Sequence, residues 1–416
     1  MSDMTADGVR DEVRAWLDET WDPERPLREW RELLADSGWG CPTWPVEHCG
    51  RGLSPALAAV VAEEFDRVGA VGTATGSAMT LAAPTILEKG SEDLKGRLLR
   101  PIITGENTWC QLFSEPGSGS DLAGLTTRAD RDGDEWVVTG QKVWTTGART
   151  AAYAMLLART DWEAPKHRGI TYFALPMRQP GVEVRPLQQM NGYASFNEVF
   201  ITEARVPHAN VVGEVGGGWG SALATLAHER GLAGNRGGRT GRGDGRTVRE
   251  AVAEAAEYNK TYVWYPQRAG RSDLIAPEAQ ERGVNGDPTV RQMAASLHAF
   301  EKAARWTADR SRAARAQGRP PGPEGSLGKL HGSEIARRSA ATHTRIAGAY
   351  GMLTGPDSPR NGIIAEVLVS VPGASIAGGT DEVQHNIIGE RVLGLPKEPT
   401  VDADIPFKEV RRNSGR

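Results

Sequence analysis

The sequence predicts an α+β protein that is mainly α, with an N-terminal helical domain, a middle β domain and a C-terminal helical bundle. Apolar residues recur at helical spacing in the first and last parts of the chain, and they alternate with a period of two between them. The length of 416 residues also exceeds what one compact core usually holds. We expect the domains to span residues 1–108, 109–216 and 217–416.

The helical pattern of the first domain runs from Val9 to about Arg100. Within it, Ser54 followed by Pro55 is typical of a helix start, because serine caps the first free N–H groups and proline fits the first helical turn. We therefore expect helices throughout this part of the chain.

Short strands are predicted for the middle domain. Asp132 and Gly133 form a turn dipeptide, and Ile170, Tyr172 and Ala174 alternate with other residues. Further alternation continues to Pro207, and the β region is expected to end near residue 216.

Helical periodicity returns after the β region and favours a bundle. The predicted helices cover residues 219–230, 289–316, 327–350 and 361–369. Two pieces, residues 234–246 and 317–325, are too poor in apolar residues to enter a core, so we expect surface loops there.

Composition excludes several classes of protein. A net charge of −4 is too near neutrality for the whole chain to bind polyelectrolytes, and one short Arg/Gly run does not change this, so no nucleic-acid partner is expected. No run of 18 apolar residues occurs, so no membrane span is expected. Three cysteines and an acidic start favour a cytoplasmic protein, and no metal site is expected.

The stretch from Trp109 to Ala129 combines a strand end with a run of small and turn-forming residues. Gly117 and Gly119 let the backbone approach a ligand, and Ser114 and Ser120 add hydroxyl groups suited to phosphate or ring carbonyl oxygens. A plain β turn explains the same residues, so this stretch alone does not predict a cofactor site.

Two further stretches have the same ambiguity. In residues 140–148, Trp144 and Thr146 are two positions apart, so they lie on the same face of a strand. There they either pack against a planar ring of a ligand or form part of the core. In residues 374–396, a glycine pair precedes Thr380 as a helix N-cap, with Asp381 and Glu382 in the first turn. An ordinary capped helix has the same pattern.

Four motifs occur along the chain in this order: GWGCPTWPVEHCGRGLSP, FSEPGSGSD, QKVWTTGA and GGTDEVQHNIIGERVLGLP. With these motifs the chain resembles the acyl-CoA dehydrogenase family over nearly its whole length. The resemblance implies that family's fold, FAD as cofactor, an acyl-CoA substrate and electron transfer to an electron-transfer flavoprotein or another acceptor. It also implies a homotetramer or heterotetramer. The motif forms look like those of bacterial members, including actinobacterial enzymes that act on branched or steroid side chains.

The resemblance assigns roles to individual residues. It places Trp144 against the flavin ring and Thr146 near its N5 atom, and it implies that Ser120 and Arg230 contact the substrate. Arg345 and Gly348 match the family more weakly and are left out. The residues implied to bind the cofactor are Phe113, Ser114, Gly119, Ser120, Trp144, Thr146, Thr380 and Glu382.

The family reaction needs a base for the proton on the carbon next to the thioester carbonyl, with a pKa raised towards neutrality. Many members carry a glutamate where this chain has Gly378. A smaller set supplies the carboxylate from a bundle helix directly before an arginine, which corresponds to Glu229. We therefore predict Glu229 as the base and rank Asp381 and Glu382 below it; the neighbouring His228 is expected to be helix surface.

Several points stay open. A related flavin oxidase or monooxygenase, or a non-catalytic subunit of a heteromeric complex, is an alternative function. Acyl length, branching and the natural electron acceptor are not readable from these residues. The FAD pyrophosphate has three candidate partners, Arg268, Arg271 and Arg282. Four arginines of the Arg/Gly segment are either CoA phosphate ligands or part of a solvated loop: Arg236, Arg239, Arg242 and Arg246.

Overall fold

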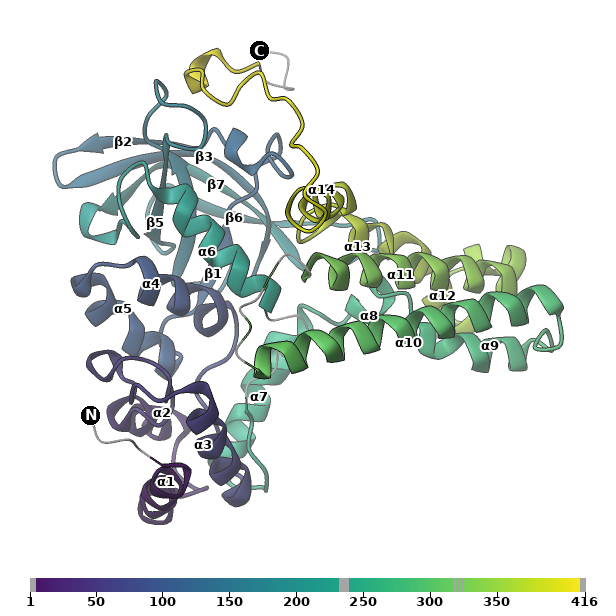
Figure 1. Ribbon diagram of the computed structural model, residues 1–416, viewed down its shortest axis with the longest axis horizontal. Helices are drawn as coiled ribbons and strands as arrows, with labels where there is room; N and C mark the ends of the chain where they lie inside the picture. The colour runs from purple at the N-terminus through teal and green to yellow at the C-terminus, as the bar shows by residue number, and fades with distance from the viewer. Residues whose placement is uncertain (1–4, 232–238, 318, 320–321, 323–324, 412–416) are drawn as a thin grey trace. The chain divides into compact units, whose positions relative to one another are not determined.

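The computed structural model (Figure 1) describes the chain except residues 1–4, 232–238, 318, 320–321, 323–324 and 412–416. Its internal contacts divide it into two compact units. The first unit consists of Met1–Leu187, Ser195–Thr261 and Val401–Arg416, and the second consists of Gln188–Ala194 and Tyr262–Thr400.

The first unit begins with the helices that the periodicity predicted: α1 (Ala6–Thr20), α2 (Leu27–Ser37), α3 (Pro55–Val68), α4 (Ala83–Lys89) and α5 (Glu92–Thr104). The predicted cap of α3 is confirmed, because the Ser54 hydroxyl accepts from the Leu57 N–H at 3.3 Å and Pro55 is the first helical residue. A π-helical turn, Ala78–Ala82, runs directly into α4.

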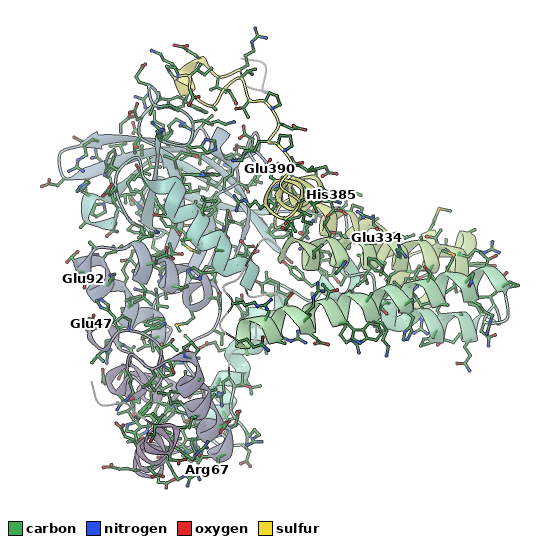
Figure 2. All side chains as sticks on the ribbon, in the orientation of Figure 1. Glu47, Arg67, Glu92, Glu334, His385 and Glu390 are labelled. Atoms are coloured by element: carbon green, nitrogen blue, oxygen red, sulfur yellow. The ribbon has the colours of Figure 1, made fainter. Side chains whose placement is uncertain are left out.

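A buried carboxylate joins α1 to α3. Glu64 is 2% exposed and accepts hydrogen bonds from Arg14, Arg10 and Arg67. These guanidinium groups, Arg14 foremost, lower the pKa of Glu64 to about 2. Arg67 is labelled in Figure 2 near the end of α3. The carboxylate is therefore ionised and fully paired at neutral pH.

The β region forms one seven-stranded sheet with the order β1-β4-β2-β3-β7-β6, and β5 pairs with β4 outside this path. The predicted turn after Asp132 is confirmed, because Asp132 pairs with Glu135 across a two-residue loop in which Gly133 has a φ of +57°. The strands are β1 (Trp109–Leu112), β2 (Arg128–Asp132), β3 (Glu135–Thr146), β4 (Tyr153–Arg159), β5 (Ile170–Pro176), β6 (Val182–Leu187) and β7 (Phe196–Pro207).

The strands β4 and β5 are buried on both faces. On one face Met155 and Tyr172 pack against helices α4 and α5, and on the other face Leu156 and Phe173 pack against residues of β3 and β7, such as Val199. Such strands read as near-continuous apolar runs. The helices and the outer strands thus form layers on either side of β4 and β5.

Two further helices belong to the first unit by their contacts. Helix α6 (Gly218–Gly231) lies on β5, where the Tyr172 hydroxyl lies 3.1 Å from the Thr225 hydroxyl. Helix α7 (Arg246–Lys260), which the periodicity did not predict, packs on α2 through two hydrogen bonds from Arg31 to Glu254. The domain boundary at residue 217 stays a prediction.

The second unit is helical, which confirms the predicted C-terminal bundle. Figure 1 shows α10 and α11 lying side by side, and α11 also contacts α12, α13 and α14. Buried apolar residues such as Ile346, Ala336 and Val367 form its cores. Its helices are α8 (Tyr265–Arg268), α9 (Ile275–Glu281), α10 (Pro288–Ala316), α11 (Gly325–Ala347), α12 (Ile363–Ser370), α13 (Pro372–Ile376) and α14 (Asp381–Arg391).

One described stretch of the second unit, Pro359–Arg391, is long and apolar enough to cross a membrane by composition alone. It is divided among α12, α13 and α14. Gly378 and Gly379, which have φ values of +72° and +86°, interrupt it before α14. A stretch so divided is weak evidence for a membrane helix.

The Glu64 cluster generates a stability prediction. Replacing Glu64 with Gln should lower the free energy of unfolding of the first unit by about 2 kcal/mol at pH 7, because hydrogen bonds to a charged group are lost. The folded-state pKa is depressed to about 2, so the difference between wild type and variant should be complete above about pH 4.3 and shrink as the pH falls towards 2.

Urea unfolding followed by tryptophan fluorescence at several pH values checks this. The exposed neighbour Glu63, which pairs with Arg10, provides the control: Glu63→Gln should change the transition by less than about 1 kcal/mol. Equal effects of the two replacements would contradict the assignment.

Candidate active site

The glycine-containing turn after β1 has open space beside it. Gly117 and Gly119 do not have left-handed φ values, and a Cβ atom added at either would meet no atom within 4 Å. Gly119 and Ser120 are exposed, whereas Phe113 is buried edge-to-face against Tyr172. Neither the backbone conformation nor the chain's own packing therefore requires glycine here, and the space is available to a ligand.

A buried ion pair holds this turn in place. The Lys142 Nζ atom on β3 lies 2.9 Å from Glu115 Oε1 and donates to the Phe113 carbonyl at 3.0 Å. Glu115 also accepts from the backbone N–H groups of Thr126 and Thr127 at 2.7 and 2.8 Å. The carboxylate thus closes the turn at both of its ends.

The Glu115 carboxylate is ionised in spite of its burial. Burial alone would raise its pKa, but Lys142 and the hydrogen bonds from Thr127 and Thr126 outweigh burial and lower the pKa to about 2. Such a pair is stable only because its oxygens and protons are also hydrogen-bonded to backbone.

Trp144 occupies a β-bulge. The register between β3 and β7 shifts between Lys142 and Thr145, and Trp144 has a φ of +63°, which is uncommon for a large side chain. The indole is 57% exposed and meets Phe196 edge-to-face with ring centroids 5.7 Å apart. The alternative of a core tryptophan is therefore wrong, since the bulge directs the ring outward.

The turn and the strand that carries Trp144 are directly bonded. The Val143 N–H donates to the Ser114 carbonyl at 2.9 Å, next to the bond from Lys142 to the Phe113 carbonyl. The structure therefore brings two of the three motifs together within the first unit. Thr146, at the end of β3, is half-buried and pairs in register with Phe196.

The predicted base lies on α6, also in the first unit. Glu229 is exposed near the end of this helix. Its neighbour His228 lies 3.7 Å from Glu88 of α4. The side chain of Arg230 lies outside the described residues. The catalytic role of Glu229 stays a prediction.

The third motif belongs to the second unit. Thr380 is the N-cap of α14, as predicted, and accepts from the Val383 N–H at 3.3 Å. Asp381 is buried between Lys329 at 2.7 Å and Arg337 at 2.6 Å. Although burial opposes it, Lys329 and its other hydrogen-bond donors hold the pKa of Asp381 well below the usual range.

The remaining acid of this motif, Glu382, is exposed. Its own backbone N–H and the Thr380 hydroxyl lower its pKa. Gly378 has a φ of +72°, and a Cβ atom there would meet no atom within 4 Å. Neither Asp381 nor Glu382 therefore has the raised pKa that a base needs.

The candidate phosphate-binding arginines that the structure describes have partners within the chain. Arg239 pairs with Asp66 at 2.5 Å, Arg246 with Glu250 at 2.7 Å, and Arg271 with Asp273 at 2.7 Å. Arg282 lies 3.9 Å from Glu278, Arg242 donates to the Asp66 carbonyl, and Arg236 lies outside the described residues. A phosphate ligand would have to compete with these contacts.

Three buried charges were not predicted from the sequence: Glu115, Lys142 and Arg159 of β4. A sequence signal was present for two of them, because Lys142 and Arg159 are charged residues inside largely apolar strands. A charge buried in such a strand requires a partner. Among the described residues, no group of three His, Cys, Asp or Glu side chains is placed to hold a metal ion.

Comparison with known families gives three matches. Residues 1–106 match the model "Acyl-CoA dehydrogenase, N-terminal domain", residues 110–203 match the middle domain, and residues 273–393 match the C-terminal domain. The two joined motifs thus lie within the matched middle domain, and most of the third motif lies within the matched C-terminal domain.

Several relatives resemble the chain along most of its length. Acyl-CoA dehydrogenase IpdE1 of Mycobacterium tuberculosis is 34% identical over 374 residues, which cover 89% of this chain and 88% of that protein. Acyl-CoA dehydrogenase FadE34 of the same organism is 35% identical over 402 residues, which cover 94% of this chain and 49% of that protein.

Solved structures show the same architecture. The Tcur3481-Tcur3483 steroid ACAD superposes with a TM-score of 0.64 at 28% identity and covers 94% of this chain and 98% of that chain. The ChsE4-ChsE5 complex from Mycobacterium tuberculosis superposes with a TM-score of 0.64 at 27% identity, with the same coverage.

The ion pair of Lys142 generates a prediction. Lys142→Met leaves a buried carboxylate without its counter-charge, so the free energy of unfolding of the β region should fall by about 3–5 kcal/mol. The double variant Lys142→Met, Glu115→Gln should recover part of the loss, because it no longer buries a charge.

Guanidinium unfolding followed by circular dichroism measures both effects. Arg128→Met removes an exposed cation that pairs with Asp130 two residues along the same strand and should leave stability unchanged within about 1 kcal/mol. A double variant less stable than the sum of its single replacements would show that the pair does not act as described.

Proposed function

Because the chain belongs to the acyl-CoA dehydrogenase family, we propose that it removes the C2 and C3 hydrogens of an acyl-CoA thioester to give the 2-enoyl-CoA, with Glu229 as the base. Members of this family are oxidoreductases and flavoproteins, and the match extends over all three of the family's domains. The identity of the base and the form of the cofactor are the finer parts of this proposal.

We propose FAD as the flavin, and the described residues fit it. An exposed indole on a strained bulge beside an open turn is the single observation that carries the assignment. FAD, when bound, supplies the acceptor for the hydride from C3. Trp144 offers a flat apolar wall, and Ser114 and Thr146 offer hydroxyl groups near it. The remaining proposed contacts are Phe113, Gly119, Ser120, Thr380 and Glu382.

The base must take the proton from C2. Asp381 is held ionised by two cations, and the pKa of Glu382 is lowered, so neither suits proton transfer near neutral pH. Gly378 has no titratable group. These observations favour Glu229, whose position directly before Arg230 matches the smaller set of family members.

Two residues, Ser120 and Arg230, are proposed to bind the substrate. Ser120 is exposed on the turn and offers a hydroxyl to a thioester or phosphate oxygen. Arg230 supplies a cation next to the base in the sequence and fits the CoA portion or the acyl group. Both act by binding and orienting the substrate so that C2 meets the carboxylate of Glu229.

We propose a homotetramer or heterotetramer in the cytoplasm, with electrons passed to an electron-transfer flavoprotein or another acceptor. Two of the similar solved structures are named as pairs of components, the Tcur3481-Tcur3483 steroid ACAD and the ChsE4-ChsE5 complex. This favours a heteromeric assembly. Gly378 also keeps a second function open, that of a non-catalytic partner subunit, which would be isolated without flavin.

Replacing Glu229 with Gln should abolish reduction of bound flavin by acyl-CoA, with a loss of at least about 100-fold in rate, because the general base is removed. Bound flavin should remain at the wild-type level. Stopped-flow absorbance under anaerobic conditions measures the rate. Glu88→Gln, which removes the carboxylate beside His228, is the control and should keep the wild-type rate. Retained single-turnover reduction in Glu229→Gln would refute the base.

Anaerobic titration of the purified protein with a panel of CoA esters should identify the substrate class. Similarity to a protein named a steroid ACAD favours esters of branched or steroid side chains over straight fatty acyl chains. We expect esters of branched or steroid side chains to bleach the yellow flavin band at lower concentrations than straight-chain esters do. Bleaching by straight chains alone would contradict this choice, and purification without flavin would favour the partner-subunit alternative.

A further inference from the structure

The last described segment of the chain returns to the first unit (yellow in Figure 1). Pro406 pairs with Pro165, and the N–H groups of Phe407 and Lys408 donate to the carbonyls of Ala164 and Trp162 at 3.0 and 3.1 Å. Residues 402–408, here called the strap, are thus paired with the loop between β4 and β5. Backbone pairing gives the strap a defined register on this loop.

Phe407 anchors the strap. Its ring is 1% exposed, lies 5.5 Å from the Trp162 ring, and has the Arg159 Cζ atom 3.3 Å from its centroid. A guanidinium over an aromatic face is attracted by the ring electrons, and the attraction is strongest where water is excluded. Arg159 is itself fully buried, so the ring covers one face of a desolvated cation.

The other contacts of Arg159 lead to the candidate cofactor turn. Its Nη2 atom donates to the Ala123 carbonyl at 2.7 Å, and its Nε atom donates to the Leu125 carbonyl at 3.2 Å. These carbonyls follow Ser120 by three and five residues. The orientation of the guanidinium therefore fixes the backbone directly after the turn.

A second link runs parallel to the first. Lys166 lies on the loop under the strap, and its Nζ atom is 2.8 Å from Asp402 of the strap and 3.2 Å from Asp121. Asp121 directly follows Ser120. The side chains of Lys166 and Asp402 are 12% and 28% exposed, so solvent screens this pair less than it screens pairs at the open surface. Asp121 is 63% exposed, so its pair with Lys166 is screened more.

We propose that Arg159 and Lys166 are positioning residues, and that the strap seated on them through Phe407 and Asp402 sets how tightly Ser120, at the end of the turn 113–120, holds acyl-CoA. The strap acts on the turn through the two cations, since Phe407 lies against Arg159 and Asp402 pairs with Lys166. This inference rests on the proposed function for its substrate, but the coupling of strap and turn is a property of the fold alone.

Three full-length variants test the inference. Phe407→Leu keeps an apolar side chain but removes the aromatic face, Asp402→Asn removes the charge that faces Lys166, and Lys408→Met removes an exposed ion pair with Glu163 in the same segment. Hydrogen exchange measures the amides of residues 114–127, and steady-state assays measure kcat and KM for the best CoA ester of the panel.

We expect amide exchange in residues 114–127 to rise about tenfold in Phe407→Leu and less in Asp402→Asn, because opening of the turn becomes easier. KM should rise about five- to tenfold while kcat stays within about twofold, since weaker orientation acts on binding. Lys408→Met should match wild type in both measurements.

Unchanged exchange in both Phe407→Leu and Asp402→Asn would overturn the inference, as would a loss of kcat without a change in KM. If Phe407→Leu fails to fold, Asp402→Asn alone decides, by the same two readouts. If wild-type protein reduces no flavin with any ester, the proposed function fails, while the exchange measurement still judges the coupling between strap and turn.

Discussion

The buried pair of Lys142 and Glu115 is the interaction on which the candidate site depends. Taking two charges out of water is costly, and the structure offsets the cost by giving each charge further hydrogen bonds to the backbone. Those bonds run to both ends of the glycine turn and to the strand that carries Trp144. A change in the pair would therefore move the two motifs relative to each other.

Around this pair, buried charges and the buried apolar residues Ala123 and Leu125 together hold the loop that follows the turn. Arg159 binds the carbonyls after the turn, and Phe407 covers its guanidinium. Loops that carry function need such support, because a binding geometry is retained only where the surrounding residues fix it. Trp144, which is exposed and strained, needs similar support, because its backbone conformation persists only on a rigid strand.

Three buried acids differ from Glu229 in their environment. Glu64, Glu115 and Asp381 are buried, paired with cations and held ionised, so they stabilise structure. Glu229 is exposed on a helix of the first unit. A catalytic carboxylate has to change its protonation state during turnover, which the locked acids do not do near neutral pH. Asp381 of the third motif belongs to the locked acids, because Lys329 and Arg337 hold it ionised.

The sequence by itself determined the helical and β regions, the caps at Ser54 and Thr380, and the family, because periodicity, capping and contiguous motifs are local properties of the chain. It did not predict α7, the bulge at Trp144, or the contacts of Lys142 and Arg159. These depend on strand register and on which distant residues meet, such as Phe407 and Arg159, 248 positions apart. Only the tertiary structure decides such contacts, since burial of a charge is set by its neighbours in space.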